Sequence, residues 1–165
     1  MQNEKTERSR PLCYTSEGCE GFKRRNPTIK TISVILCVAL SATPCLNLQG
    51  DLANLEDAFL QAEADHGVDA AFLAAVAALE SGWGESELAR EKNNLFGWRG
   101  ADGYMAFDSK EDCIDHVAAY LAKEYLDPDG IYYRGTTVED VAKHYCGGNE
   151  AWIEAVENIM QSVGS

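Results

Sequence analysis

Apolar residues recur at the three- and four-residue spacing of amphipathic helices from Asp51 onward. This periodicity predicts a first helix, capped by Asp51 and ending near His66, whose buried face consists of Leu52, Leu55, Phe59 and Ala62. Residues 82–108 break the pattern, since they are rich in glycine, asparagine and aromatic side chains. There we expect a loop, one helical turn over 86–90, and a short hairpin that turns over 100–103 between arms 96–98 and 104–107.

The segment from Ala70 to Glu80 has a different pattern, because it is apolar on nearly every side. Asp69 precedes it as a predicted cap, and Ser81-Gly82 ends it. A helix that is hydrophobic all round is buried within its domain. We therefore expect this segment to lie at the centre of the fold.

Three further helices are predicted after the hairpin. The first starts at Ser109 with Asp112 as a capping box, the second starts at Thr137 with Asp140 and runs to Tyr145, and the last starts at Asn149. Residues 127–130 read Asp-Pro-Asp-Gly, which is a turn. The chain has no internal repeat, and the fold class that follows is mainly α with a small β excursion.

The first 45 residues form a separate region. A basic cluster, which ends at Lys30, precedes an apolar run over residues 32–42 and a small-residue exit at 41–44. This order is typical of a secretory signal, and the run is shorter than the about 20 residues of a membrane span. A buried strand or short core helix is the alternative. Residues 1–22 read as an extended leader or an overlong start, so we place one domain over residues 46–165.

Charge divides the chain at the same point. Residues 1–45 hold seven Lys or Arg against four acids, whereas residues 46–165 hold seven against twenty-three, which together give the net charge of −13. A domain this acidic repels nucleic-acid phosphates and anionic membrane surfaces, so we exclude both as partners. We expect it to act as a monomer.

Cysteine usage adds no metal or cofactor site. Four of the six cysteines lie in the first 45 residues, which leaves Cys113 and Cys146 as a disulfide or as two buried thiols. Neither a Cys-x-x-Cys pair nor a His/Cys cluster occurs, so we expect no cofactor. Cys146 and His144 are two residues apart and face away from one another on a helix, which argues against a cysteine peptidase.

Glu80 is the candidate for chemistry, since it is a carboxylate at the end of an apolar helix. Partial desolvation there favours the neutral form and raises the pKa, as a general acid requires. The alternative is a solvated residue at the end of the helix. Aromatic residues in the following segment, Trp83, Phe96, Trp98 and Tyr104, favour a sugar-stacking surface over a small second core.

These residues resemble a known family. The stretch Glu80-Ser81-Gly82-Trp83-Gly84-Glu85-Ser86, followed by Asn93-Asn94-Leu95-Phe96-Gly97, is similar to the signature of glucosaminidases of glycoside hydrolase family 73. The similarity covers roughly residues 51–163 and implies a lysozyme-like fold, with a helical lobe and a small β-hairpin lobe flanking a glycan cleft.

The resemblance also implies an activity and a set of site residues. It implies an exported peptidoglycan hydrolase that cleaves the β-1,4 bond after N-acetylglucosamine, with Glu80 as the catalytic acid and Tyr145 near the reacting sugar. It also implies that Trp83, Asn94, Phe96, Gly97 and Trp98 lie along the glycan cleft, and we predict that Ser86 and Tyr104 bind substrate with them.

A second catalytic carboxylate is harder to assign. Hydrolysis by the usual route needs one at about 5–5.5 Å or 6.5–9.5 Å from the acid, depending on stereochemistry. Asp102 at the hairpin turn is our prediction, with a solvated turn residue as the alternative and Asp108 and Glu111 as other acids nearby. Without a second acid, a substrate-assisted hydrolase, a lytic transglycosylase forming anhydro-muramyl products, and a non-catalytic glycan-binding module remain.

Overall fold

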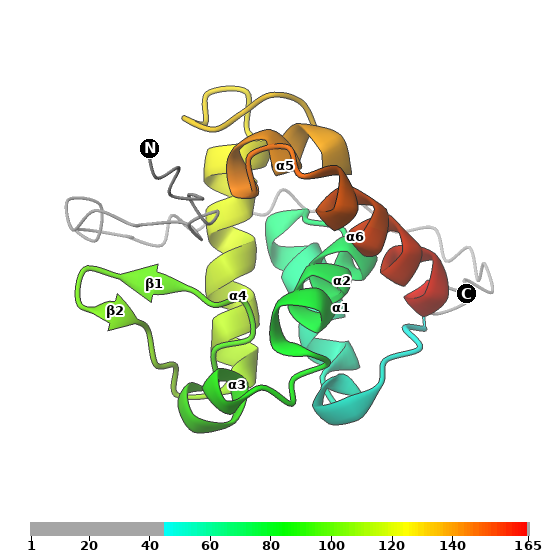
Figure 1. Ribbon diagram of the computed structural model, residues 1–165, viewed down its shortest axis with the longest axis vertical. Coiled ribbons are helices and arrows are strands. Elements are labelled where there is room, and N and C mark those ends of the chain that lie inside the picture. The colour runs from blue at the N-terminus through cyan, green and yellow to red at the C-terminus, as the bar shows by residue number, and fades with distance from the viewer. Residues whose placement is uncertain (1–44, 165) are drawn as a thin grey trace, which may run out of the picture.

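The computed structural model describes residues 45–164 of the chain (Figure 1). The predicted leader over residues 1–22 and the signal core over residues 32–42 lie outside the described residues, as do Cys13, Cys19 and Cys37. Among the helices that are described, none is both long and apolar enough to span a lipid bilayer.

Six α-helices and one two-stranded antiparallel sheet make up the described fold (Figure 1). A 3-10 turn, η1, and a π-helical turn, η2, complete it. In chain order the elements are η1 (Gly50–Leu52), α1 (Glu56–His66), α2 (Ala70–Ser81), α3 (Glu87–Lys92), β1 (Arg99–Gly100), β2 (Gly103–Tyr104), α4 (Lys110–Leu121), η2 (Ala122–Leu126), α5 (Val138–Tyr145) and α6 (Glu150–Val163). The prediction of a mainly α fold with a small β excursion is confirmed.

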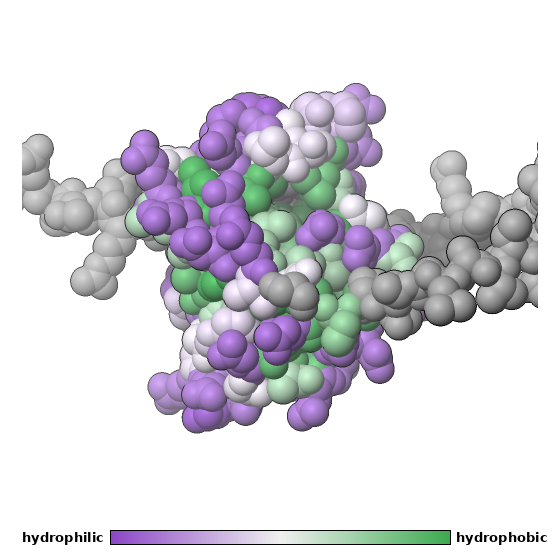
Figure 2. Space-filling view, turned by 90° about the vertical axis from the view of Figure 1, so that its right-hand side faces the viewer, coloured by the Kyte–Doolittle hydropathy of each residue, from purple (hydrophilic) through white to green (hydrophobic). Residues whose placement is uncertain are grey.

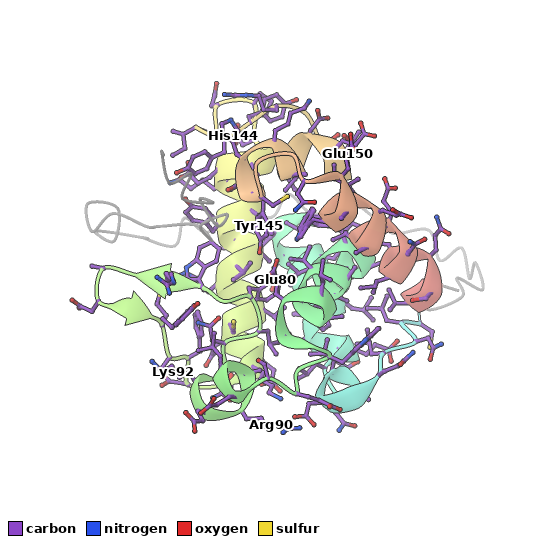
Figure 3. All side chains as sticks on the ribbon, viewed as in Figure 1. Glu80, Arg90, Lys92, His144, Tyr145 and Glu150 are labelled. Atoms are coloured by element: carbon purple, nitrogen blue, oxygen red, sulfur yellow. The ribbon has the colours of Figure 1, made fainter. Side chains whose placement is uncertain are left out.

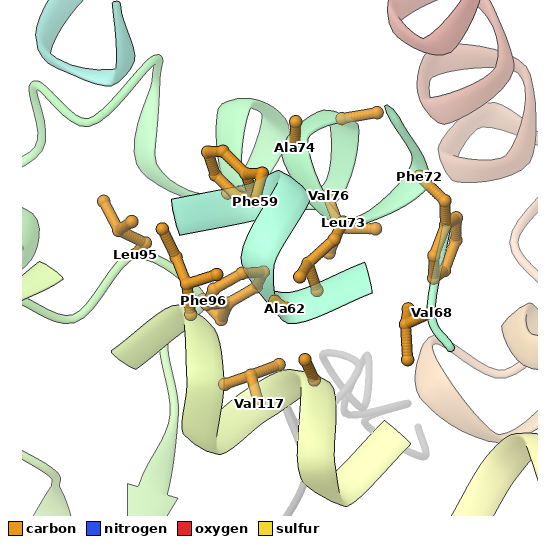
Figure 4. Packing of buried hydrophobic residues seen from close by; sticks show 14 of the residues in the cluster. Phe59, Ala62, Val68, Phe72, Leu73, Ala74, Val76, Leu95, Phe96 and Val117 are labelled. Carbon is orange, nitrogen blue, oxygen red and sulfur yellow. The ribbon is translucent and has the colours of Figure 1, made fainter. Parts of the chain in front are cut away.

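Helix α2 occupies the centre, as its all-round apolar sequence predicts. Its side chains from Phe72 to Ala78 are buried without exception, and it packs against both α1 and α6. Alanines hold four of these positions, so the neighbouring helices can approach its backbone closely. Figure 4 shows Leu73 and Val76 converging with Phe59 of α1, with Phe96 and with Val117 of α4. Full burial of each large aliphatic or aromatic side chain contributes about 1.5–3 kcal/mol.

The outer helices close the core with one apolar face each. Val156 of α6 is fully buried, while Ile159 and Met160 are half-buried against the same cluster. Figure 2, which views the side of the molecule that carries α6, shows hydrophobic surface between polar residues. This is the amphipathic pattern expected of surface helices.

Most predicted helix starts are confirmed by their caps. The Asp69 carboxylate accepts a hydrogen bond from the Phe72 amide at 2.7 Å, and Ser109 accepts one from the Asp112 amide at 3.0 Å. Thr137 and Asp140 form a reciprocal capping box at the start of α5. These starts could be predicted because each depends on residues within one turn of the helix.

The predicted start of the first helix at Asp51 is wrong. Residues 50–52 form η1, and α1 begins only at Glu56. The reason is a distant contact: a Cβ on Gly50 would lie 2.8 Å from the carbonyl oxygen of Trp83, so this segment is fitted to the loop that follows α2. Asp51 instead pairs with Arg90 and Lys110, each at 3.5 Å.

The predicted hairpin arms are wrong, because residues 96–98 form no strand and Tyr104 alone of residues 104–107 lies in one. Only Arg99 with Tyr104 and Gly100 with Gly103 pair as strand residues, although the turn lies where expected. The reason is Asn94, whose side-chain amide donates to the carbonyls of Trp98 and Met105, both at 2.8 Å, and accepts from the Trp98 amide at 2.8 Å. The Asn94 side chain thus binds backbone carbonyl and amide groups at the base of the hairpin, where the paired strands end.

The described cysteines, Cys45, Cys113 and Cys146, are free thiols. Of the two alternatives for Cys113 and Cys146, the structure therefore has the thiols and no disulfide. Cys113 is fully buried, and burial raises the pKa of its thiol to about 12. The Cys146 thiol donates to the Ala142 carbonyl at 3.4 Å.

The loop after α2 gives a direct test of packing. Gly84 has a φ of +81° and a Cβ there would lie 3.0 Å from Cβ of Asp51, whereas Gly67 has a φ of +73° with open space around it. We expect Gly67→Ala to lower the free energy of unfolding by about 1–2 kcal/mol for the left-handed backbone. Gly84→Ala should cost a further ~1–3 kcal/mol for the overlap. Urea unfolding measures both, and equal losses would contradict the packing described.

Candidate active site

Glu80 lies in the last turn of α2, below Tyr145 in the view of Figure 3. Its Oε1 accepts a hydrogen bond from Nε1 of Trp152 at 3.1 Å. Trp152 belongs to the first turn of α6, 72 residues further along the chain. Because α2 and α6 pack directly on one another, this bond fixes the carboxyl between two helices that the core already holds.

Two opposing effects act on the Glu80 carboxyl. Desolvation raises its pKa above the ordinary value, and the hydrogen bond from Trp152 lowers it by a smaller amount, so the net direction is upward. The residue nevertheless remains exposed to solvent. The site therefore holds a carboxyl whose pKa is raised by desolvation and which a ligand can still reach.

Tyr145 is the second polar group at this point. It is the last residue of α5, it is buried, and its ring centroid lies 5.1 Å from that of Trp152. Burial and the nearby negative charge of Glu80 hold the pKa of the phenol well above its usual range. Tyr145 is therefore a permanent hydroxyl donor in the surroundings of Glu80.

The loop that follows Glu80 is held by the residue next to it. The buried Ser81 hydroxyl donates to the Ala77 carbonyl at 2.6 Å and accepts from the Gly84 amide at 2.8 Å. Gly82, Trp83 and Gly84 have φ values of +58°, +61° and +81°, three left-handed residues in succession. Glycine adopts this conformation readily and tryptophan does not, so Trp83 is strained. Ser86 then caps α3 by accepting from the Ala89 amide at 3.2 Å.

Comparison with known proteins identifies this arrangement. The family model "Glucosaminidase: Mannosyl-glycoprotein endo-beta-N-acetylglucosaminidase" matches residues 56–165.

The chain belongs to the glucosaminidase family. A Streptococcus pneumoniae protein named as an endo-beta-N-acetylglucosaminidase is 27% identical over 163 residues, which cover 91% of this chain. The chain spans about a quarter of that relative's length, 24%.

Two solved structures share the fold. The catalytic domain of the autolysin Auto from Listeria monocytogenes has a TM-score of 0.55 and 19% identity, with 67% of this chain and 81% of that chain covered. A truncated glycoside hydrolase domain of FlgJ from Salmonella typhimurium has a TM-score of 0.51 and 20% identity, with 67% and 93% covered. The expected lysozyme-like fold is thereby confirmed.

Three of the glucosaminidase motif residues predicted to contact substrate are buried instead. Asn94, Phe96 and Trp98 are exposed by only 1%, 2% and 3%. The interpretation of Phe96 and Trp98 as exposed stacking residues is therefore wrong, and the alternative of a small second core is right for them. The reason is that the irregular backbone over 93–98 turns these side chains inward, where Trp98 packs edge-on against Tyr120 at 5.0 Å.

The remaining predicted contacts of this glucosaminidase domain lie at the surface. Trp83 is half-buried, Tyr104 is 41% exposed, and Gly97 has a φ of +63° with open space where a Cβ would lie. Ser86 is half-buried, and its hydroxyl serves as the helix cap described above.

Asp102 lies in the turn between β1 and β2, at the end of the hairpin that points away from the helices (Figure 1). It is exposed, and the described residues show no contact between it and Glu80. No carboxylate in the described part of the chain contributes to the pKa of Glu80. Asp102 as the second acid remains a prediction.

A continuous series of aromatic rings connects Glu80 with the hairpin. The ring centroids of Trp152 and Tyr145 are 5.1 Å apart, those of Tyr145 and Tyr125 6.4 Å, those of Tyr125 and Tyr120 6.3 Å, and those of Tyr120 and Trp98 5.0 Å. Tyr125 belongs to η2, and π-helical turns often occur at functional sites. Its fully buried hydroxyl has no partner among the described residues.

Sequence reasoning missed two of these features. The sequence did not predict that the indole of Trp152 donates to Glu80. No local signal marks η2, because the sequence over 122–126 reads as ordinary helix.

A cavity of about 550 Å³ lies elsewhere on the surface, and Glu80 does not line it. Its walls include Phe107, Asp112 and His116, together with His66 and Asp115, which are joined at 2.7 Å. The described residues contain no group of three or more His, Cys, Asp or Glu side chains arranged to hold a metal ion.

The raised pKa of Glu80 has a consequence for stability. Because the folded-state pKa exceeds the unfolded value, stability falls as the pH rises from the unfolded pKa through the folded one. Glu80→Gln removes this penalty and its amide oxygen still accepts from Trp152. We expect the variant to unfold at a higher temperature than wild type at pH 7, and the difference to vanish below about pH 4.

Glu157→Gln, which neutralises an exposed glutamate of α6, controls for the loss of one charge from the acidic domain. Thermal unfolding between pH 3 and pH 8 measures both variants. A Glu80→Gln variant that is less stable than wild type at pH 7 would contradict the desolvation of this carboxyl.

Proposed function

We propose that this domain cleaves the β-1,4 glycosidic bond after N-acetylglucosamine in peptidoglycan, with Glu80 as general acid. The observation that carries the proposal is the desolvated but accessible Glu80 carboxyl, held by Trp152 within a chain of the glucosaminidase family. A protonated carboxyl near neutral pH is what departure of a sugar alkoxide requires.

Each neighbour of Glu80 has a proposed part in the step. Glu80 donates its proton to the glycosidic oxygen, and the resulting carboxylate keeps the hydrogen bond from Trp152 Nε1, which stabilises the charge. Tyr145 stays protonated throughout, and its hydroxyl donates a hydrogen bond to the reacting sugar or to the attacking water. Trp83, Gly97 and Tyr104 contact the glycan from the rim of the site.

The attacking group distinguishes two candidate functions. Hydrolysis with a second carboxylate requires Asp102 to approach the substrate as the hairpin closes. Cleavage without one uses the N-acetyl group of the substrate, or the 6-hydroxyl of N-acetylmuramic acid as in a lytic transglycosylase. The second candidate function is supported by the position of Asp102, which is exposed in the turn of a hairpin that points away from the helices (Figure 1).

The place of action follows from the same proposal. Peptidoglycan lies outside the cytoplasmic membrane, and the predicted signal over residues 32–42 would export the domain to it. The domain then acts as a secreted or wall-associated monomer of a bacterium or a phage.

Digestion of purified cell walls tests the activity. We expect new N-acetylglucosamine reducing ends, and a loss of several orders of magnitude in Glu80→Gln, since the proton donor is removed. Anhydro-muramyl products would favour the transglycosylase, and muramic acid reducing ends or no release would overturn the proposal. Asp102→Asn, compared with Asp129→Asn in another exposed turn, tests the second acid: only the former should lose activity.

The hydrogen bond from Trp152 sets the upper end of the pH range. Trp152→Phe removes a donor that favours the ionised carboxylate, so the pKa of Glu80 should rise further. Since the acid must be protonated, the alkaline limb of the pH profile of kcat/KM should move to higher pH. Trp83→Phe also replaces an indole near the site, but one that does not bond to Glu80, so it should leave the position of that limb unchanged. A limb that moves equally in both variants would argue against this role for Trp152.

A further inference from the structure

Arg99 differs from the other cations of the described residues in having no acceptor. Six of the seven Lys and Arg side chains from residue 45 to 164 bind a carboxylate or a backbone carbonyl, namely Arg90, Lys92, Lys110, Lys123, Arg134 and Lys143. Arg99 has neither an ion pair nor a hydrogen bond within that part of the chain, and its Nε is buried without a partner. Buried donors are almost always paired in folded proteins, so the unpaired Nε singles out Arg99 as a cation that the fold itself does not use, with its two terminal nitrogens left for a ligand.

The surroundings of Arg99 hold its guanidinium in a fixed plane. Its Cζ lies 4.1 Å from the centroid of the Tyr104 ring, and the two residues are direct cross-strand partners in the hairpin. Lys92 holds β2, the strand of Tyr104, by donating a hydrogen bond to the Tyr104 carbonyl at 3.3 Å. A guanidinium stacked on an aromatic face keeps its edge free for a planar acceptor.

The hairpin connects directly to the site at Glu80. Arg99 follows Trp98, which is the hairpin end of the aromatic series that leads to Trp152. Figure 1 shows the two strands standing beside α4, on the side away from α6. A ligand group bound at Arg99 would thus belong to a part of the substrate away from the bond that is cleaved.

We propose that Arg99, stacked on Tyr104, binds a carboxylate of the glycan substrate. This inference rests on the proposed function, since peptidoglycan carries carboxylates on its lactyl ether and on its peptide stems. Arginine binds such groups with two parallel hydrogen bonds, which no sugar hydroxyl matches. The site selects muramic-acid-containing strands over uncharged polymers of N-acetylglucosamine.

The net charge of the domain gives this contact its importance. Residues 46–165 carry a charge of −16, which repels an anionic strand at long range. Asp102, in the same turn, forms no ion pair with Arg99 among the described residues, so the guanidinium keeps its full charge for a ligand. One unpaired arginine would then attract the strand locally and set its position.

Binding is measured on a Glu80→Gln background, so that strands stay intact whatever the reaction. We expect Arg99→Met to weaken binding to carboxylate-bearing strands about tenfold or more, and Arg99→Lys to weaken it less, because a charge-assisted pair contributes roughly one to two factors of ten. Arg134→Met, which removes an exposed arginine bonded only to a carbonyl, should bind as the parent does.

Three forms of one strand preparation identify the source of the carboxylate. Strands with peptide stems carry stem carboxylates, amidase-treated strands carry free lactyl carboxylates, and methylamine-coupled strands carry none. If Arg99→Met weakens binding only to strands with peptide stems, the carboxylate belongs to the stem. If it weakens binding to amidase-treated strands, the carboxylate is that of the lactyl group. Equal loss on the neutralised strands, or no loss on any form, overturns the proposal, and thermal unfolding checks that Arg99→Met is folded. Failure of wild type to cleave would instead count against the proposed activity.

Discussion

The burial of α2 on every side is the constraint from which the site follows. A helix without a polar face must be enclosed by other elements, and here α1 and α6 enclose it. Its last turn is where the chain first reaches solvent again, so Glu80 lies where apolar core and surface meet. Both properties of the carboxyl, desolvation and accessibility, come from that position.

The short motif after Glu80 serves this position rather than the chemistry itself. Ser81 bonds the loop back onto α2, the two glycines permit a backbone that other residues adopt only under strain, and Ser86 starts the next helix. Gly84 also allows contact with Asp51 of η1. Most residues of the motif therefore have a structural role, and the same holds for the buried Asn94 and Phe96. The residues that face a ligand are fewer than the motif suggests.

What the sequence predicted well was local. Caps at Asp69, Ser109 and Thr137 act within one turn, and the periodicity of α2 needs no knowledge of its neighbours. What it missed depends on contacts between distant segments. The start of α1 depends on Gly50 meeting Trp83, and the partner of Glu80 is 72 residues away. Arg99 could not be selected from the sequence, because what distinguishes it is the lack of an acceptor that the other described cations have. Glu80 itself could be selected because position and motif coincide.

The three tryptophans of the chain mark different points between Glu80 and the hairpin. Trp152 is bonded to the carboxyl of Glu80, Trp83 forms the strained loop beside it, and Trp98 lies beneath the hairpin. The tryptophan fluorescence of the protein therefore comes from beside Glu80, from the loop that follows it and from the base of the hairpin. Protonation of Glu80 changes the charge beside the indole of Trp152, and movement of the loop changes the surroundings of Trp83. Tryptophan fluorescence therefore reports on the protonation of Glu80 and on the conformation of the loop that follows it, without an added label.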